Sequence, residues 1–285
     1  MVALMKEELG VSNFSRALRV EHISMPTVVS HSCGECGTNR LHTPYLMERA
    51  IVQTPVILCG PIALFAFIAI AAEPTVGKTE IYPQLRVYLE ARTAEFDQIP
   101  IERKNDLKKI ALFVKSRTKA KQPTRLTFIC THNSRRSHIS QIWAAAAASY
   151  YDIGGVETFS GGTEATAFNP RAIAAIKRAG LKVEKSVDGK NSRYEVRFTD
   201  TNNPLICYSK IYNEAPNPKE DFCAVMTCSQ ADKSCPIIDG SLLRVAIPYE
   251  DPKASDDKPE EEKTYDERSR QICREMLYLF SEAGN

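Results

Sequence analysis

The feature that most constrains this chain is a short loop between a predicted strand and a predicted helix. Residues 125–129 (RLTFI) have the apolar composition of a buried strand, and an apolar stripe beginning at Ile139 predicts a helix. The connection, 130–137 (CTHNSRRS), places a cysteine at the carboxyl end of the strand and an arginine and a serine at the amino end of the helix. Successive backbone N–H groups in such a loop form an anion-binding concavity, and the helix dipole adds to it. The loop therefore predicts a site for a tetrahedral oxyanion.

The rest of the chain after residue 123 continues the alternation of strands and helices. Predicted further elements are strands at 156–159 and 222–227, a helix from Asn169-Pro170 to Gly180, a hairpin of 194–198 and 205–208 inside an insertion at 186–221, and a last helix opened by a Thr264/Glu267 capping box. This order predicts an α/β fold, with a parallel sheet flanked by helices on both faces. In such folds ligands bind at the carboxyl ends of the strands, where Cys130 lies.

The first third of the chain has a different character. Residues 50–72 carry no charge and are apolar enough for a membrane span or a signal peptide, and they end in the cleavage-like Ala69-Ile70-Ala71. Translation from Met47 would leave a compact signal peptide, whereas the alternative of a buried helix conflicts with Pro55 and Pro61. We expect residues 1–79 to be a leader with a signal or anchor segment. The protein would then be exported or associated with a membrane through 50–72, and otherwise cytoplasmic.

Two other N-terminal patterns do not predict a catalytic site. His31, Cys33, Cys36 and His42 superficially resemble a zinc site, but the second pair lacks workable spacing, so we predict no metal. Apolar residues at helical spacing on both sides of Pro100 predict a helical hairpin at 80–122, an N-terminal extension of a catalytic domain at 123–285.

Composition excludes several classes of protein. Lys+Arg 37 against Asp+Glu 35 gives a net charge of only +2, which argues against a nucleic-acid partner. Nine cysteines in 285 residues are too sparse for a disulfide scaffold, and their odd number leaves at least one thiol unpaired. Reactive thiols are the better interpretation.

Cys130 is the first candidate among these thiols. A cysteine at a helix amino end beside arginine is favoured as the thiolate, which is the nucleophilic form. The Arg136 guanidinium can grip two oxygens of a bound anion, and Ser137 can donate a hydrogen bond to the sulfur. A buried structural thiol is the alternative for a lone cysteine at a strand end.

The loop resembles the C-x5-R-S phosphate loop of the low-molecular-weight tyrosine phosphatases and of the arsenate reductases built on that fold. The similarity covers about residues 124–285 and includes SGGTEATAFNPRA after the second strand. It implies that Cys130 is the nucleophile, supported by Ser137. It also implies a set of substrate-binding residues, namely Thr131, His132, Asn133, Ser134, Arg135 and Arg136. Arg135 departs from the pattern, because many relatives have cysteine or a small residue there.

The resemblance also implies an acid on an Asp-Pro loop that protonates the leaving oxygen. Asp251-Pro252 matches by position and by dipeptide, with Glu250 as the alternative acid. A solvated acidic loop is the other interpretation of this region, because the negative run continues through residues 256–262.

A cysteine pair separates the two branches of this family. Thioredoxin-coupled arsenate reductases have two further cysteines, the second followed by proline, and Cys228 and Cys235-Pro236 match that spacing. The resemblance therefore implies a thiol relay of Cys130, Cys228 and Cys235 that reduces arsenate without a bound cofactor and is regenerated by thioredoxin. The alternatives are a phosphatase that uses a phosphocysteine, with two unrelated core thiols, and a non-enzymatic, membrane-attached redox or oxyanion-binding module.

The spacing of the pair has a mechanical consequence. In a regular helix Cys228 and Cys235 would be separated by roughly 10 Å between Cα atoms, whereas a disulfide needs less than about 7 Å. We expect the segment to be helical or looped when reduced and to unwind partly when oxidised.

Overall fold

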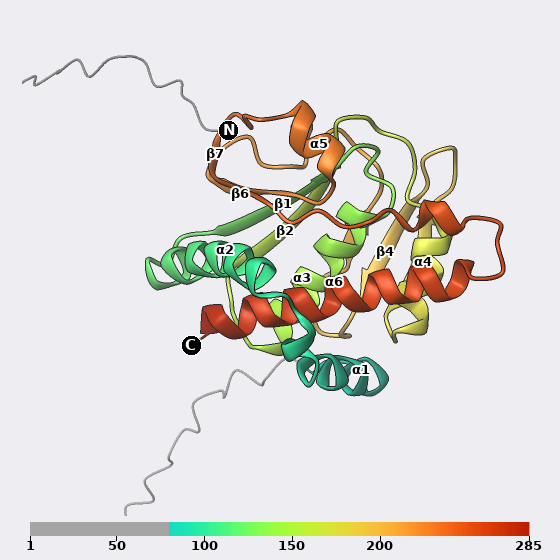
Figure 1. Cartoon of the computed structure of the whole chain (residues 1–285), viewed down its shortest axis with the longest axis horizontal. Coiled ribbons are helices and arrows are strands. Elements are labelled where there is room, and N and C mark those ends of the chain that lie inside the picture. Colours follow the sequence, from blue (N-terminus) through green and yellow to red (C-terminus); the bar gives the residue numbers. More distant parts are fainter. Residues whose placement is uncertain (1–79, 285) are drawn as a thin grey trace, which may run out of the picture. The chain divides into compact units, whose positions relative to one another are not determined.

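A computed structural model describes residues 80–284 of the chain (Figure 1). The elements in chain order are α1 (Pro83–Thr93), η1 (Phe96–Gln98), α2 (Ile101–Lys119), β1 (Thr124–Cys130), α3 (Arg136–Tyr150), β2 (Val156–Gly162), α4 (Pro170–Arg178), β3 (Lys182–Val187), β4 (Arg193–Arg197), β5 (Leu205–Cys207), β6 (Phe222–Met226), α5 (Ser229–Ser234), β7 (Ser241–Ala246), η2 (Pro252–Ser255) and α6 (Glu261–Gly284). The expected leader, with its apolar segment 50–72 and the zinc-like residues 31–42, lies outside the described residues. Within 80–284, no helix is both long and apolar enough for a membrane crossing.

The central sheet has four parallel strands in the order β2-β1-β6-β7. β1 pairs with β2 and β6 along its length, so Cys130 lies opposite Gly162, and Ile129 opposite Met226. Because the strands are parallel, their carboxyl ends meet at one edge of the sheet, which is where ligands bind in such folds. The predicted parallel sheet with its helices is confirmed.

The two faces of the sheet are covered differently. Alternate residues of β1 point to opposite sides, so Phe128 belongs to the main core and Ile129 to a second, smaller cluster. The first face is covered by α2, α3 and α6, which Figure 1 shows below the sheet. There the buried Trp143 of α3 donates through Nε1 to Ser269 Oγ of α6 at 3.0 Å. The short α5 covers part of the second face, and its Ala231 is fully buried in the smaller cluster.

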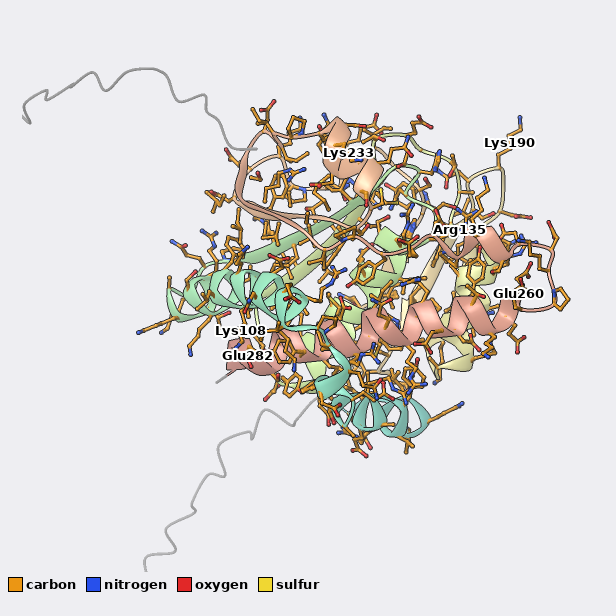
Figure 2. All side chains as sticks on the ribbon, viewed as in Figure 1. Lys108, Arg135, Lys190, Lys233, Glu260 and Glu282 are labelled. Atoms are coloured by element: carbon orange, nitrogen blue, oxygen red, sulfur yellow. The ribbon has the colours of Figure 1, made fainter. Side chains whose placement is uncertain are left out.

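The N-terminal helices belong to the same core as the sheet. Leu89 of α1 and Leu107 of α2 are completely buried, and both helices pack on α6 rather than forming a hairpin against each other. Lys108 Nζ of α2 lies 3.8 Å from Glu282 Oε2 of α6, and Figure 2 labels both side chains.

The second sheet is antiparallel, in the order β3-β4-β5. Its β4–β5 hairpin was expected, but β3 was not, because most of its side chains are exposed and its sequence lacks an apolar pattern. β7 was missed for a related reason, since it is an edge strand with only partly covered side chains.

The predicted start of the last helix was wrong. α6 begins at Glu261, and Thr264 lies inside its first turn, where its hydroxyl donates to the Glu260 carbonyl at 2.9 Å. The side chain of Glu261 accepts from the backbone N–H of Asp257 at 2.6 Å, so a carboxylate inside the helix satisfies an N–H group ahead of it.

The segment after β5, residues 208–212, joins the two sheets and lies against the 130–137 loop. Gly162 at the end of β2 donates its N–H to the Lys210 carbonyl at 2.9 Å and accepts from the Tyr212 N–H at 3.0 Å. A Cβ on Gly162 would lie 2.6 Å from the Thr131 carbonyl oxygen and 2.7 Å from the Asn133 nitrogen. Only glycine therefore lets the end of β2 approach the loop so closely.

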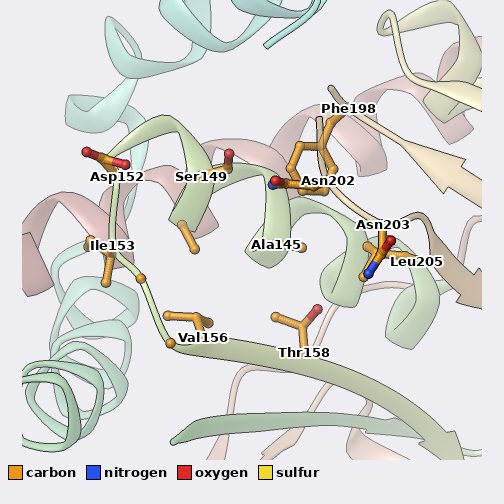
Figure 3. A pocket seen from close by; sticks show the side chains of 13 residues that line it. Ala145, Ser149, Asp152, Ile153, Val156, Thr158, Phe198, Asn202, Asn203 and Leu205 are labelled. Carbon is orange, nitrogen blue, oxygen red and sulfur yellow. The ribbon is translucent and has the colours of Figure 1, made fainter. Parts of the chain in front are cut away.

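A cavity lies at the opposite end of β2 from Cys130 (Figure 3). The amino end of β2, the carboxyl end of α3 and the turn before β5 contribute its lining, including Val156, Ser149 and Asn203. It is separate from the edge of the sheet at which the strands end.

Burial perturbs the lysine in the joining segment. Lys210 is 5% exposed, and burial lowers its pKa from 10.5 to about 8. Its Nζ donates to the Tyr208 carbonyl at 3.2 Å and lies 4.6 Å from the centroid of the Tyr208 ring. The folded protein therefore holds a charged lysine at neutral pH under a desolvation cost.

Replacing Leu107 by alanine tests whether the N-terminal helices share the core. We expect the free energy of unfolding to fall by about 2 to 5 kcal/mol, because a fully buried leucine leaves a cavity. Leu112→Ala on the same helix is the control, since Leu112 is 67% exposed and should change stability by less than about 0.5 kcal/mol. Urea unfolding measures both, and equal small losses would contradict the shared core.

The buried lysine predicts a pH dependence of stability. Between pH 8 and 10 the unfolded chain keeps a proton that folded Lys210 has lost, so stability rises with pH. Relative to Lys210→Met, the parent should gain about 2 kcal/mol between pH 7 and pH 10. The comparison with this variant cancels the effect of tyrosine ionisation near pH 10. Urea unfolding across this range tests it, and parallel profiles for the two proteins would refute it.

Candidate active site

The loop between β1 and α3 is shaped by one asparagine. Asn133 is fully buried and has φ of 42°, a left-handed conformation that asparagine tolerates better than most residues. Its Nδ2 donates to Ser137 Oγ at 2.9 Å, and its Oδ1 accepts from the Lys210 N–H at 2.9 Å. The side chain therefore ties the middle of the loop both to the first turn of α3 and to the segment that joins the two sheets.

The Cys130 sulfur is hydrogen-bonded within the same network. Ser137 Oγ lies 3.1 Å from Cys130 Sγ, and both side chains are buried. The Ser137 oxygen accepts from Asn133, and the serine hydroxyl can either donate to the sulfur or accept from a thiol.

Arg136, the first residue of α3, reaches across the pocket to the loop after β7. Its Nη1 donates to the Tyr249 carbonyl at 3.0 Å, and its Nη2 donates to Asp251 Oδ2 at 2.8 Å. Asp251 also accepts from the Lys253 N–H at 3.1 Å, which makes it the cap of η2. The cation and the acid expected at the site therefore meet directly.

Arg135 is held by acidic and phenolic groups. Its Nε donates to Tyr265 Oη at 2.9 Å, and its Nη2 lies 3.6 Å from Asp256. Tyr265 in turn donates to Asp256 at 2.7 Å, and burial raises the pKa of Tyr265 to about 12. Figure 2 shows Arg135 near the amino-terminal part of α6.

Most of the residues expected at the site line one small pocket. Its lining consists of Cys130, His132, Ser134, Arg135, Arg136 and Asp251. Glu250 is exposed and does not contribute. The side chains of Thr131 and Asn133 are buried in other contacts, and neither residue lines the pocket. At the rim, His132 Nε2 lies 3.5 Å from Glu164.

Cys228 lies next to the loop. It follows β6, the strand beside β1, and its Sγ is 3.4 Å from Thr131 Oγ1, the side chain adjacent to Cys130. Its Sγ also accepts from the Ala231 N–H at 3.4 Å, as the cap of α5. Cys130 and Cys228 are almost fully buried in the same apolar cluster.

Cys235 ends the same short helix on its more exposed side. α5 separates it from Cys228, and its side chain packs on the cluster while remaining partly accessible. Its carbonyl accepts from Arg244 Nε of β7 at 3.1 Å. Cys130, Cys228 and Cys235 are all free thiols.

The residues that sequence reasoning missed support the site from behind. The Tyr249 backbone carbonyl accepts a hydrogen bond from Arg136, and any residue type could provide that carbonyl. His138 stacks on Phe168 with ring centroids 4.2 Å apart, and burial, aided by the Lys210 charge, lowers its pKa well below 6.5. The apolar stripe of α3 begins at Ile139 and does not include His138, so no pattern in the sequence indicated its burial.

Known proteins related in sequence share one name. The chain is 32% identical to arsenate reductase 2 of Staphylococcus epidermidis over 127 aligned residues. This alignment covers 44% of this chain and 76% of that protein. It is 29% identical over 157 residues to the arsenate reductase of Brevibacillus brevis, covering 55% and 93%. The arsenate reductase of Bacillus subtilis is 26% identical over 157 residues, covering 55% and 94%.

Solved structures give more distant matches, and no family model matches the chain. A low-molecular-weight phosphotyrosine phosphatase of Vibrio cholerae O395 aligns with 10% identity and a TM-score of 0.38, covering 55% of this chain and 95% of that one. A thioredoxin-dependent arsenate reductase of Corynebacterium glutamicum aligns with 16% identity and a TM-score of 0.30, covering 66% and 92%. By its sequence relatives, the chain is an enzyme that belongs to the arsenate reductase family.

Proposed function

We propose that this enzyme reduces arsenate to arsenite through a relay of Cys130, Cys228 and Cys235. The observation that carries the proposal is the position of Cys228, whose sulfur lies 3.4 Å from the side chain adjacent to Cys130. A phosphatase resolves its cysteine adduct with water and has no use for a second thiol there. The names of the sequence relatives agree with this choice of substrate.

The first step forms a bond between sulfur and arsenic. Arsenate binds to the backbone N–H groups of the loop and to Arg136, and the Cys130 thiolate attacks arsenic. An arsenic–oxygen bond breaks, and Asp251 protonates the departing oxygen so that water leaves. Ser137 stabilises the thiolate before the attack.

The second step is the reduction. The Cys228 thiolate attacks Cys130 Sγ, a Cys130–Cys228 disulfide forms, and the sulfur–arsenic bond breaks with its electron pair going to arsenic. Arsenic is thereby reduced from the +5 to the +3 state, and arsenite leaves. The two thiols supply both electrons.

The third step moves the disulfide toward the surface. The Cys235 thiolate attacks Cys228, which releases Cys130 and leaves a Cys228–Cys235 disulfide. Cys235 is more exposed than the other two thiols, so an external dithiol reaches this pair more readily. We assign thioredoxin, or a thioredoxin-like protein, as that reductant.

The alternative is a phosphatase that uses Cys130, Arg136 and Asp251 alone, since these three line one pocket. The two functions differ in what Cys228 and Cys235 do. A Cys228→Ser/Cys235→Ser variant with full phosphatase turnover, beside a parent that forms no arsenite, would establish the phosphatase.

Substitution of the two downstream cysteines separates the steps of the relay. Cys228→Ser should form no arsenite, because the adduct has no thiol to reduce it. Cys235→Ser should release one arsenite per enzyme and then stop, even with thioredoxin, thioredoxin reductase and NADPH present. Cys223→Ala, a buried thiol on the other face of β6, is the control and should turn over like the parent. Continued turnover by Cys235→Ser would contradict the third step.

Oxidation should unwind α5, because a regular helix holds Cys228 and Cys235 too far apart for a disulfide. In the structure, the N–H of Asp232 donates to the Cys228 carbonyl and that of Cys235 to the Ala231 carbonyl, both at 3.0 Å. We expect both amides to exchange faster with solvent in the oxidised protein. The Tyr151 N–H, bonded to Ala147 at the far end of α3, is the internal control. Equal protection in both redox states would argue against unwinding.

A further inference from the structure

We propose that Arg103 of helix α2 is a positioning residue for this reaction. It holds residues 248–251, and these in turn place the Asp251 carboxylate in the pocket that Cys130 lines. The inference rests on the proposed function, and it makes the N-terminal extension a working part of the site.

Arg103 makes two contacts with the 248–251 segment and a third with α6. Its Nη2 donates to the Pro248 carbonyl at 2.6 Å, and its guanidinium lies 5.3 Å from the centroid of the Tyr249 ring. Its Nε lies 3.7 Å from Oε2 of Glu275, a residue of α6. One planar guanidinium thus contacts a backbone carbonyl, a ring and a carboxylate at once.

Glu275 completes this contact from the other side. It is 1% exposed, and it accepts from Tyr249 Oη at 2.8 Å and from Gln271 Nε2 at 3.1 Å. Burial, with the neighbouring Glu275 charge, raises the pKa of Tyr249 well above 10, so the phenol remains a donor. A buried carboxylate needs a cation and donors around it, and Arg103 and Tyr249 supply them.

The Tyr249 residue that Arg103 contacts also binds Arg136, the partner of Asp251. The Tyr249 carbonyl accepts from Arg136 Nη1 at 3.0 Å, and two residues later Asp251 accepts from Arg136 Nη2 at 2.8 Å. The Tyr249 N–H donates to the Thr227 carbonyl at 3.1 Å, one residue before Cys228. A shift of the Pro248–Tyr249 peptide would therefore move the cation and the acid together.

The structure places no such connection at the other end of α2. Arg117, in the last turn of the same helix, also donates to a proline carbonyl, that of Pro123 at 3.1 Å. Pro123 precedes β1 at the edge of the sheet farthest from Cys130. The two arginines make similar hydrogen bonds, and only Arg103 makes its bond to the segment that carries Asp251.

The experiment compares Arg103→Met with Arg117→Met in the full-length chain. We expect Arg103→Met to lower kcat for arsenate about tenfold, because small displacements of catalytic groups cost that much or more. KM should change by less than about twofold, since the backbone N–H groups of the loop still bind the anion. Arg117→Met should match the parent, and Arg103→Lys, which restores one charged donor to the Pro248 carbonyl, should recover part of kcat.

A double-mutant cycle distinguishes positioning from a general loss of stability. Asp251→Asn alone should lower kcat about 100-fold. If Arg103 acts through Asp251, adding Arg103→Met to that variant should lower kcat by less than about twofold more. Amide exchange at Tyr249 gives a readout without turnover, and it should be faster in Arg103→Met than in Arg117→Met.

Three results would overturn the proposal. They are an unchanged kcat in Arg103→Met, the same loss in Arg117→Met, and a full tenfold loss in the Asp251→Asn background. If Arg103→Met does not fold, Arg103→Lys takes its place in the cycle. If the parent forms no arsenite, the proposed function has failed, and the same cycle is measured on phenyl phosphate hydrolysis, where Asp251 would protonate the leaving group. Unchanged exchange at Tyr249 would count against Arg103 in either case.

Discussion

The buried side chain of Asn133 is the contact on which the site depends. Through one amide it fixes the left-handed turn of the loop, donates to the serine that serves Cys130 and accepts from the segment that joins the two sheets. An amide with donors and an acceptor can do this where a carboxylate or an aliphatic side chain cannot. The segment that follows the small antiparallel sheet therefore contributes to the shape of the loop through the Lys210 N–H.

Parallel pairing explains why residues nearly 100 positions apart meet. β1 and β6 are neighbours in register, so the residues that follow their carboxyl ends, Thr131 and Cys228, come within 3.4 Å. The proposed relay thus uses a general property of such sheets. The helix α5 then connects Cys228 to Cys235. A short helix is suited to this role, because few hydrogen bonds have to break when the second disulfide forms.

The sequence alone predicted the parts of this arrangement that have local patterns. The strand–loop–helix around Cys130, the Asn169 cap and the β4–β5 hairpin each have characteristic residue types at fixed spacing. Side-chain chemistry likewise indicated Cys130 and Arg136, and the family resemblance implied the other residues that line the pocket, including Asp251. What was missed depends on tertiary contacts. β3 and β7 lack a strong apolar alternation, and Tyr249 acts through a carbonyl that every residue possesses. Arg103 resembled the other basic residues on an exposed helix until its contact with Pro248 was known.

The ion pair between Arg136 and Asp251 also bears on the proposed reaction. Before substrate arrives, Arg136 Nη2 donates to Asp251 Oδ2 at 2.8 Å. In the proposed first step an oxyanion on the loop takes Arg136 as a partner, while Arg135 Nη1 still lies 3.8 Å from Asp251 Oδ1. Asp251 can act as the acid of that step only if residues 248–251 stay in place while Arg136 changes partners.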